Sequence, residues 1–106
     1  MVTCIFGEII LYVVNFNNTS KYFLKKKKFI LNDKNKKIVL IPPNYASAHL
    51  CISSKCVFHY KFSYKGKYPD FNYQKSFKWN DPKFKIKWPI KKPILSSRDK
   101  KSKFID

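Results

Sequence analysis

The sequence predicts a single all-β domain, and three observations support this class. The run Ile9–Val14 is apolar and rich in β-branched residues, as expected for a strand that is buried on both faces. In the stretch Lys83–Trp88, every second residue is a lysine and the others are apolar, which is the period of a half-buried strand. No periodicity indicates a helix longer than a turn or two. With 106 residues, the chain has room for one domain.

Short strands separated by turn residues are predicted along the first part of the chain. Val2–Phe16 is expected to form two strands around Gly7, because glycine permits a sharp reversal. Asn32–Asn35 has the composition of a hairpin-type turn. The remaining strands are expected at Phe29–Leu31, Lys37–Ile41, Cys51–Ser53 and Val57–Phe62.

The C-terminal part is expected to hold one more strand and an irregular end. Asn80–Pro82 is predicted as a turn, and Pro89 ends the following strand because it cannot donate to a ladder. Pro93–Asp99 is predicted as an extended arm. The domain is therefore expected to cover residues 1–99, with a mobile polar tail over residues 100–106.

The chain is strongly basic, with a formal net charge of +17 from 23 basic and 6 acidic residues. Such a charge favours an anionic partner. Arg98 is the only arginine, however, whereas proteins that read nucleic acids usually rely on bidentate arginine contacts. Nucleic acid is therefore not expected as the main partner. The run Lys25–Lys28 is interpreted as a solvated surface, with a phosphate site as the alternative.

Cysteine usage and the N-terminal segment predict a cytoplasmic protein. The chain has an odd number of cysteines, at Cys4, Cys51 and Cys56, and they form no CxxC motif. This favours free thiols in a reducing compartment. The first residues lack a basic region and contain Glu8, so a signal peptide is not expected. The apolar run Ile9–Val14 is too short to span a membrane.

Two histidines and two cysteines lie close together in the sequence and are candidate metal ligands. They follow the pattern H-x-C-x4-C-x2-H, at His49, Cys51, Cys56 and His59. This spacing is not a common zinc pattern, and Cys51 and His59 fall on strands with large apolar neighbours. The sequence therefore predicts no metal and no other cofactor.

Three motifs near the C-terminus resemble those of a known family. They are W-N-D-P at residues 79–82, I-x-W-P at residues 86–89 and P-I-L-S-x-R-D at residues 93–99. Together, and with a spacing that matches without gaps, they resemble the C-terminal signature of the dTDP-4-dehydrorhamnose 3,5-epimerase family. The resemblance implies a cupin-type jelly-roll β-sandwich and an activity on nucleotide-linked sugars.

The N-terminal strands resemble the same family, with three departures. The family pattern L-V-x-C-x-x-G-x-(I/V)-x-D-V-x-V-D-x-R is matched by Val2, Cys4, Gly7, Glu8, Val13 and Val14. The two family aspartates fall at Leu11 and Asn15, and the arginine falls at Asn17. These changes remove polar groups that would face the substrate in the family.

A central block resembles a sub-branch of this family. Residues 41–50 read I-P-P-N-Y-A-S-A-H-L, similar to the I-P-P-N-F-x-N-A-H of members that act on other nucleotide-linked sugars. Ser47 stands where the rhamnose enzymes have histidine, and His49 takes the sub-branch position. Tyr60-Lys61 matches the family's Y-K, and residues 64–68 resemble a Y-x-G-x-Y insert.

The family mechanism assigns roles to several residues of this chain. A 4-keto group acidifies the protons on C3 and C5 of the sugar, a histidine removes one, and a tyrosine returns one on the other face. The resemblance implies that Tyr60 is the acid and that Asp99 orients the base. It also implies substrate contacts by His49, Asn44, Lys61 and Tyr64. Without the resemblance, Tyr60 would be interpreted as core packing, Asp99 as an exposed carboxylate and His49 as a structural histidine.

The catalytic base of the family has no counterpart in this sequence. The family histidine lies in an R-G-x-H-x-Q block upstream of L-V-x-C, and this chain begins at Met1-Val2-Thr3-Cys4. We therefore expect an N-terminally truncated jelly roll with little turnover alone, as a homodimer or with a complementing N-terminal fragment. His59 and Tyr60 would point to opposite faces of a strand, so His59 is not expected to replace the base.

Three classes of function follow from the sequence. The first is 3,5- or 3-epimerisation of a nucleotide-linked 4-keto sugar for surface polysaccharide synthesis. The second is a non-catalytic cupin-like module that binds a nucleotide sugar or another anionic ligand. The third, nucleic-acid binding, predicts a steep salt dependence of binding to any oligonucleotide.

Overall fold

The structure is a computed structural model that describes residues 1–61 and 75–105. The predicted insert at residues 64–68 therefore lies outside the described residues. The chain divides into two compact units, Met1–Ser63 and Tyr64–Asp106. Each unit has its own hydrogen-bond network and is considered by itself.

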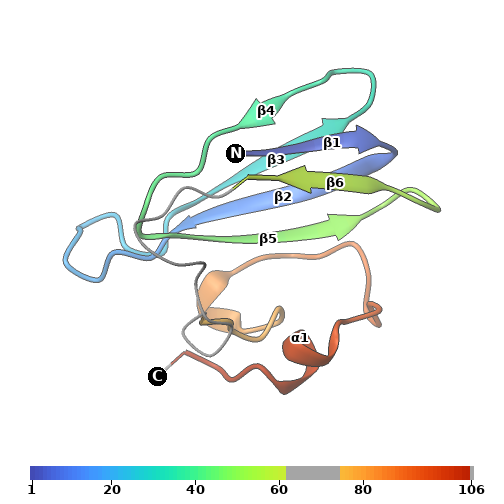
Figure 1. Ribbon diagram of the computed structural model, residues 1–106. Coiled ribbons are helices and arrows are strands. Elements are labelled where there is room, and N and C mark those ends of the chain that lie inside the picture. Colours follow the sequence, from blue (N-terminus) through green and yellow to red (C-terminus); the bar gives the residue numbers. More distant parts are fainter. Residues whose placement is uncertain (62–74, 106) are drawn as a thin grey trace. The chain divides into compact units, whose positions relative to one another are not determined.

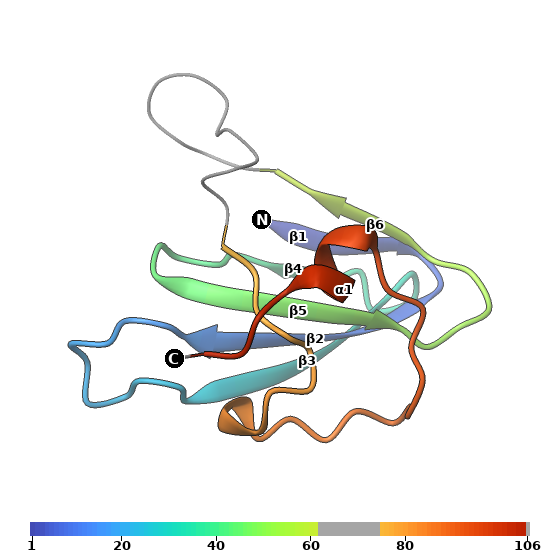
Figure 2. The same cartoon turned by 90° about the horizontal axis from the view of Figure 1, so that it is seen from below.

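The first unit is a sandwich of two three-stranded antiparallel sheets (Figure 1). One sheet has the strand order β4-β1-β6 and the other has the order β3-β2-β5. Figure 2 shows the second sheet with β2 in its middle. The strands are β1 (Val2–Phe6), β2 (Glu8–Asn15), β3 (Lys26–Asn32), β4 (Ile38–Val39), β5 (Tyr45–Cys51) and β6 (Val57–Tyr60).

Strand β2 organises the core, and its predicted burial on both faces is confirmed. All six residues of Ile9–Val14 are buried. Ile9, Leu11 and Leu31 have no exposed surface and pack in one cluster with Val2 and Cys4 of the opposite sheet. Burying side chains of this size removes apolar surface from water at about 25 cal/mol per Å², so this cluster holds the sheets together.

The predicted reversal at Gly7 is confirmed and carries the chain from one sheet to the other. Gly7 has a φ of 82°, a region that side chains disfavour. A Cβ atom at this position would collide with the carbonyl oxygen of Lys55 and lie 2.6 Å from Ser53 Oγ. The Gly7 N–H donates to Asp33 Oδ2 at 3.1 Å. Only glycine fits this crossing.

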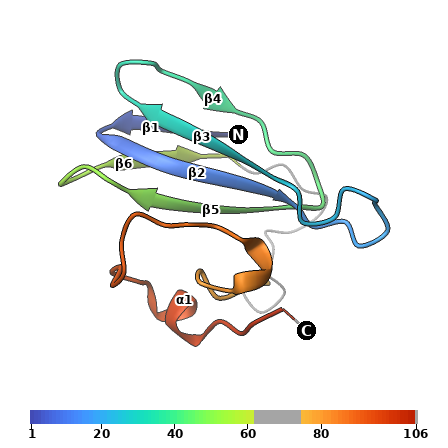
Figure 3. The same cartoon turned by 180° about the vertical axis from the view of Figure 1, so that it is seen from behind.

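Two predictions about the connections between strands are wrong. The predicted turn after Asn32 forms, and in it the Asn32 side chain accepts a hydrogen bond from the Asn35 N–H at 2.7 Å. This turn does not close a hairpin, because β3 and β4 pair with different strands (Figure 3). The strand expected at Cys51–Ser53 instead ends at Cys51. Ser53 Oγ accepts from the Glu8 N–H at 2.9 Å and donates to the Lys55 carbonyl at 2.7 Å, which turns the chain towards β6.

In the second unit, the strand predicted over Lys83–Trp88 is wrong. Pro82–Phe84 forms a 3₁₀ turn that Asp81 caps by accepting from the Lys83 N–H at 2.9 Å. Lys85 then takes a left-handed conformation with a φ of 53°, which no strand allows. The alternation still predicts which side chains are buried here, since Phe84 is 8% exposed and the lysines on either side of it are exposed. Capping chemistry overrode the strand pattern.

The C-terminal segment also differs from the expected extended arm. A short helix, α1 (Ser97–Lys101), replaces the end of the expected arm, and the hydroxyl of Ser96 caps it by accepting from the Asp99 N–H at 3.2 Å. Beyond it, the Lys103 carbonyl accepts from the Lys78 N–H at 2.9 Å. Asp81 Oδ2 accepts from the Ile105 N–H at 2.7 Å. Hydrogen bonds therefore hold this segment within its unit.

Candidate active site

Strand β5 presents a row of exposed side chains to the space between the two sheets. Cys51 packs against the core, so the side chains two, four and six residues before it point the same way. These are His49, Ser47 and Tyr45, and all three are exposed while the alternate residues are half-buried. The inner face is thus packed at the Cys51 end and open at the Tyr45 end.

Strand β6 adds a second row that meets the first. The imidazole of His49 stacks on the ring of Phe58, with centroids 4.2 Å apart and planes at 17°. The Phe58 ring in turn lies 5.9 Å from the ring of Tyr60. The structure therefore brings the two predicted residues His49 and Tyr60 to one inner face, joined through Phe58. His59 lies on the opposite face of β6 and is exposed, as its register predicts.

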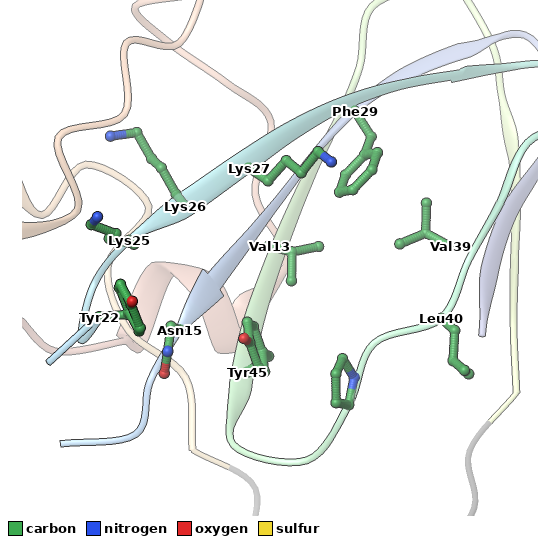
Figure 4. A pocket seen from close by; sticks show the side chains of 11 residues that line it. Val13, Asn15, Tyr22, Lys25, Lys26, Lys27, Phe29, Val39, Leu40 and Tyr45 are labelled. Carbon is green, nitrogen blue, oxygen red and sulfur yellow. The ribbon is translucent and has the colours of Figure 1, made fainter. Parts of the chain in front are cut away.

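An open cavity of about 410 Å³ lies at this same end of the sandwich. We call it the lysine cavity, and its lining comes from the end of β2, the starts of β3 and β5, the turn before β3 and the segment around β4 (Figure 4). The lining residues are Val13, Asn15, Tyr22, Lys25, Lys26, Lys27, Phe29, Val39, Leu40, Pro42 and Tyr45. The register places Val39 and Tyr60 on either side of Val2, so the cavity lies two strands from Tyr60.

The lysine cavity is lined by residues that are not among the predicted site residues. Lys25–Lys28 is predicted as a solvated surface, with a phosphate site as the alternative; all four lysines are exposed, and three of them line the cavity. Their signal was the position of Lys27 two residues before Phe29 and four before Leu31, which puts all three on the inner face of one strand. The segment Tyr22–Lys25 offered no such signal, because it is a turn.

The other predicted substrate contacts fall in different surroundings. Asn44 has a φ of 67°, which asparagine tolerates, and its carbonyl accepts from the Phe16 N–H at 2.9 Å at the entrance to β5. Lys61 is exposed directly after β6, and its backbone pairs with Met1. Asp99 lies in α1 of the second unit and is half-buried. Tyr64 lies outside the described residues.

The departures from the family pattern have a structural explanation at two positions. Leu11 stands where the family has aspartate, and it is completely buried in the apolar core. A carboxylate there would lie among apolar side chains, with His49 as its cross-strand neighbour, whereas leucine completes the core. Asn15 replaces the second aspartate and lines the lysine cavity, where it keeps a polar but uncharged group.

The three thiols occupy the packed end of the sandwich. Burial, and then a hydrogen bond with Cys51, raises the pKa of Cys56 to about 12. Burial likewise raises the pKa of Cys4, whose thiol donates to the Phe6 carbonyl at 3.1 Å. Thiols with raised pKa values are poor nucleophiles near neutral pH. Among residues 1–61 and 75–105, no three acidic, histidine or cysteine side chains are grouped to hold a metal.

The family motifs of the second unit have structural roles. The indole N–H of Trp88 donates to the Trp79 carbonyl at 3.0 Å and so joins two of the three motifs. Asp81 of W-N-D-P is 3% exposed and accepts backbone hydrogen bonds from Lys83 and Ile105. Burial opposes its ionisation, but these two N–H groups and the Lys83 charge lower the pKa of Asp81 below its ordinary value. No helix in the described parts of the chain is long and apolar enough to cross a membrane.

Comparison with known proteins identifies the family of this chain. The family model of dTDP-4-dehydrorhamnose 3,5-epimerase matches residues 1–106. An epimerase of this name from Shigella flexneri is 28% identical over 107 residues, covering 100% of this chain and 58% of the relative. Its counterpart from Pseudomonas aeruginosa is 29% identical, covering 97% and 56%. The chain thus spans a little over half the length of these curated relatives.

Solved structures agree in fold. The dTDP-6-deoxy-D-glucose-3,5-epimerase of Legionella pneumophila, solved with dTDP-4-keto-L-rhamnose, has a TM-score of 0.86 at 26% identity and covers 97% of this chain and 54% of its own. The Bacillus anthracis dTDP-4-dehydrorhamnose 3,5-epimerase has a TM-score of 0.90 at 24% identity, covering 98% and 58%. The predicted cupin-type β-sandwich is confirmed. The chain belongs to the dTDP-4-dehydrorhamnose 3,5-epimerase family.

Proposed function

We propose that this chain acts on a nucleotide-linked 4-keto sugar and takes part in inverting its C3, its C5 or both, for surface polysaccharide synthesis. The observation that supports this most is the placement of His49 and Tyr60 on one inner face of the sandwich, where both contact the ring of Phe58. The relative from Legionella pneumophila, solved with dTDP-4-keto-L-rhamnose, supports the class of substrate.

Tyr60 suits the role of the acid that returns a proton to the sugar. It is 51% exposed on the inner face, so a ligand between the sheets can approach its hydroxyl. Proton abstraction next to the 4-keto group forms an enolate, and inversion then needs a proton donor on the face opposite the base. We propose that Asp99 of the second unit orients the base, as the family motif implies, and that His49, Asn44, Lys61 and Tyr64 contact substrate.

We propose that the catalytic base lies outside these 106 residues. None of the 106 residues forms an R-G-x-H-x-Q block, and the chain has two histidines. His59 is on the outer face, and the stacking of His49 on Phe58 fixes that imidazole beside the acid, not across the sugar from it. We propose that this polypeptide alone turns over its substrate at a rate about 10²–10⁴-fold lower than that of a complete site. Assembly with a second polypeptide would supply the base.

The test is incubation of the purified chain with a nucleotide-linked 4-keto-6-deoxy sugar in deuterated water, with NMR detection of deuterium at C3 and C5. The proposal predicts slow exchange by the chain alone and faster exchange when a polypeptide with the family's R-G-x-H-x-Q block is added. Tyr60→Phe should abolish the added activity. Fast exchange by the chain alone that disappears in His49→Ala would show that His49 is the base and contradict the proposal.

The second candidate function is binding without catalysis. The lysine cavity favours it, because a basic and aromatic pocket persists in a chain that has no counterpart of the base block. A nucleotide sugar that binds to the chain but exchanges no deuterium, even with the complementing polypeptide, would select this alternative.

A further inference from the structure

We propose that Cys51 and Cys56 form a reversible disulfide with each other by exchange with a low-molecular-weight disulfide such as glutathione disulfide. The three cysteines of the chain are free thiols in the structure. The reacting pair lies at the two ends of the turn that joins β5 to β6 (Figure 1). It takes no part in the proposed epimerisation, so this oxidation site is independent of that function.

The strands on either side of this turn hold the two sulfur atoms close to each other. Cys51 ends β5 and Cys56 lies directly before β6, and both side chains pack against the same core cluster. Two residues farther from the turn on each strand, the His49 ring stacks on the Phe58 ring with centroids 4.2 Å apart. Because alternate residues of a strand share a face, this ring contact places the two thiols opposite each other.

A hydrogen bond joins the two thiols. It favours the protonated form of Cys56, so Cys56 donates and the sulfur of Cys51 accepts. The Cys51 thiol donates to the Ser53 carbonyl at 3.3 Å. Two sulfur atoms in hydrogen-bond contact need to approach further only to the disulfide bond length of about 2.05 Å, which side-chain rotation can supply.

Hydrogen bonds outside the pair fix the turn. Ser53 Oγ accepts from the Glu8 N–H at 2.9 Å and donates to the Lys55 carbonyl at 2.7 Å. The Ile52 N–H donates to the Glu8 carbonyl at 3.0 Å. Little chain freedom is therefore lost when the two sulfur atoms react, and closure of the disulfide is faster than in an unfolded chain.

The surroundings of the thiols assign them different roles. Burial, and then the hydrogen bond with Cys51, raises the pKa of Cys56 to about 12, so Cys56 keeps its proton near neutral pH. Cys51 is half-buried and is therefore the thiol of the pair that attacks the small disulfide. Cys4 is 3% exposed, so the small disulfide does not reach its sulfur.

The exchange has two steps. Cys51 loses its proton to solvent, and its sulfur attacks one sulfur of the small disulfide, which gives a mixed disulfide and releases one small thiolate. That thiolate takes the proton of Cys56, whose sulfur attacks the Cys51 sulfur and releases the second small thiolate, which takes a proton from solvent. The protein loses two electrons and two hydrogens, and the small disulfide becomes two thiols. Excess small thiol reverses both steps, as expected in a reducing compartment.

The experiment is incubation of the folded chain with glutathione disulfide, followed by alkylation of the remaining thiols, digestion with trypsin and mass spectrometry. Trypsin cuts after Lys55, so Cys51 and Cys56 fall in different peptides, 38–55 and 56–61. We expect these two peptides to be linked, the intact mass to be lower by two hydrogen atoms, and Cys4 to be alkylated. Dithiothreitol should restore the original mass.

Three variants separate the roles of the cysteines. Cys56→Ala should stop the reaction after its first step, with one glutathione attached to Cys51. Cys51→Ala should react at Cys56 at least about tenfold more slowly than the wild-type chain reacts at Cys51. Cys4→Ala is the matched control, because it also removes a thiol from the packed end. In Cys4→Ala, the disulfide should form at a rate within about twofold of the wild-type rate.

A comparison in concentrated urea tests whether the fold builds the site. The folded wild-type chain should convert the mixed disulfide to the internal one at least about tenfold faster than the unfolded chain. The oxidised chain should also melt at least about 5 °C above the reduced chain. Equal conversion rates would overturn the proposal, as would a disulfide that includes Cys4 or a folded chain that stays at the mixed disulfide. These outcomes concern the wild-type chain, so they decide the matter even where a variant does not fold.

Discussion

The two ends of the sandwich share strands but differ in construction. At one end, Cys4, Ile9 and Leu31 fill the space between the sheets, and burial raises the pKa values of Cys4 and Cys56. At the other end, the same strands carry Asn15 and Lys27, and the space is open. The packed end holds the sheets in register, which frees the open end to carry polar and charged groups that destabilise a core. Stability and ligand binding are thus assigned to opposite ends of the same strands.

Truncation of a core residue should give the largest effect on stability. Leu31 is completely buried at the packed end, so Leu31→Ala should lower the free energy of unfolding by about 2–5 kcal/mol. Tyr45→Ala at the open end should cost less than about 1 kcal/mol, because that side chain is 42% exposed. Urea denaturation of both variants measures the difference. Equal losses would contradict the division between the two ends.

In the second unit, two aspartates show a similar division between a residue that stabilises the fold and one with a proposed role in catalysis. Asp81→Asn should lower the free energy of unfolding by about 1–3 kcal/mol, because an amide cannot accept both backbone hydrogen bonds that the buried carboxylate accepts. The pKa of Asp81 is lowered in the folded state, so its contribution is present above the ordinary value of 3.8 and is lost as pH falls below it.

Asp99→Asn is the comparison for that variant. Its thermal stability should stay close to that of the wild-type chain, whereas deuterium exchange in the complemented sample should fall, since we propose that Asp99 orients the base. Thermal melting at pH 7 and pH 3.5 separates the two aspartates. A pH-independent difference between Asp81→Asn and the wild-type chain would argue against the assigned role of Asp81.

Alkaline pH should weaken the packed end selectively. The pKa of Cys56 is raised to about 12 from an ordinary 9.0, so the folded state retains the proton that the unfolded state releases. The stabilisation by the neutral thiol is therefore complete below pH 9.0 and is lost as pH rises towards 12. Melting temperatures at pH 8, 10 and 11 should fall less in Cys56→Ala than in the wild-type chain. Equal falls in the two proteins would mean that Cys56 ionises as readily in the folded protein as in the unfolded chain.

A small gain is expected from relieving backbone strain beside the lysine cavity. Leu24 has a φ of 67°, which costs a non-glycine residue about 1–2 kcal/mol. Leu24→Gly should raise the free energy of unfolding by about 0.5–1 kcal/mol, after the greater flexibility of glycine in the unfolded chain is subtracted. Binding of a nucleotide-linked 4-keto sugar should not change. A loss of stability would show that the Leu24 side chain contributes more by packing than the strain costs.

The sequence predicted those features that depend on neighbouring residues. Ile9–Val14 is apolar on both faces and can only be a central strand, and Gly7 sits where a Cβ atom would collide with Lys55. The prediction for Lys83–Trp88 failed because alternation reports burial, whereas strand formation also needs a pairing partner. There, the Asp81 cap made the 3₁₀ turn the better local solution.

The candidate site was predictable in part, for a similar reason. The family motifs indicated Tyr60 and His49, and strand alternation placed His59 on the other face. The lysine cavity was not predicted, because it forms where Tyr22, Val39 and Tyr45 approach one another from segments far apart in the chain. No local pattern reports such an approach, and a lysine run alone is indistinguishable from a solvated surface.

The most direct test of the account is mapping of a bound nucleotide-linked 4-keto sugar by amide chemical shifts on the isotopically labelled chain. We predict saturable shifts for Lys27, Tyr45, His49 and Tyr60 at the open end, with little change at Cys4 and Leu31. Saturable shifts at Cys4 and Leu31, with the open end unaffected, would contradict the central claim that the ligand binds at the open end of the sandwich.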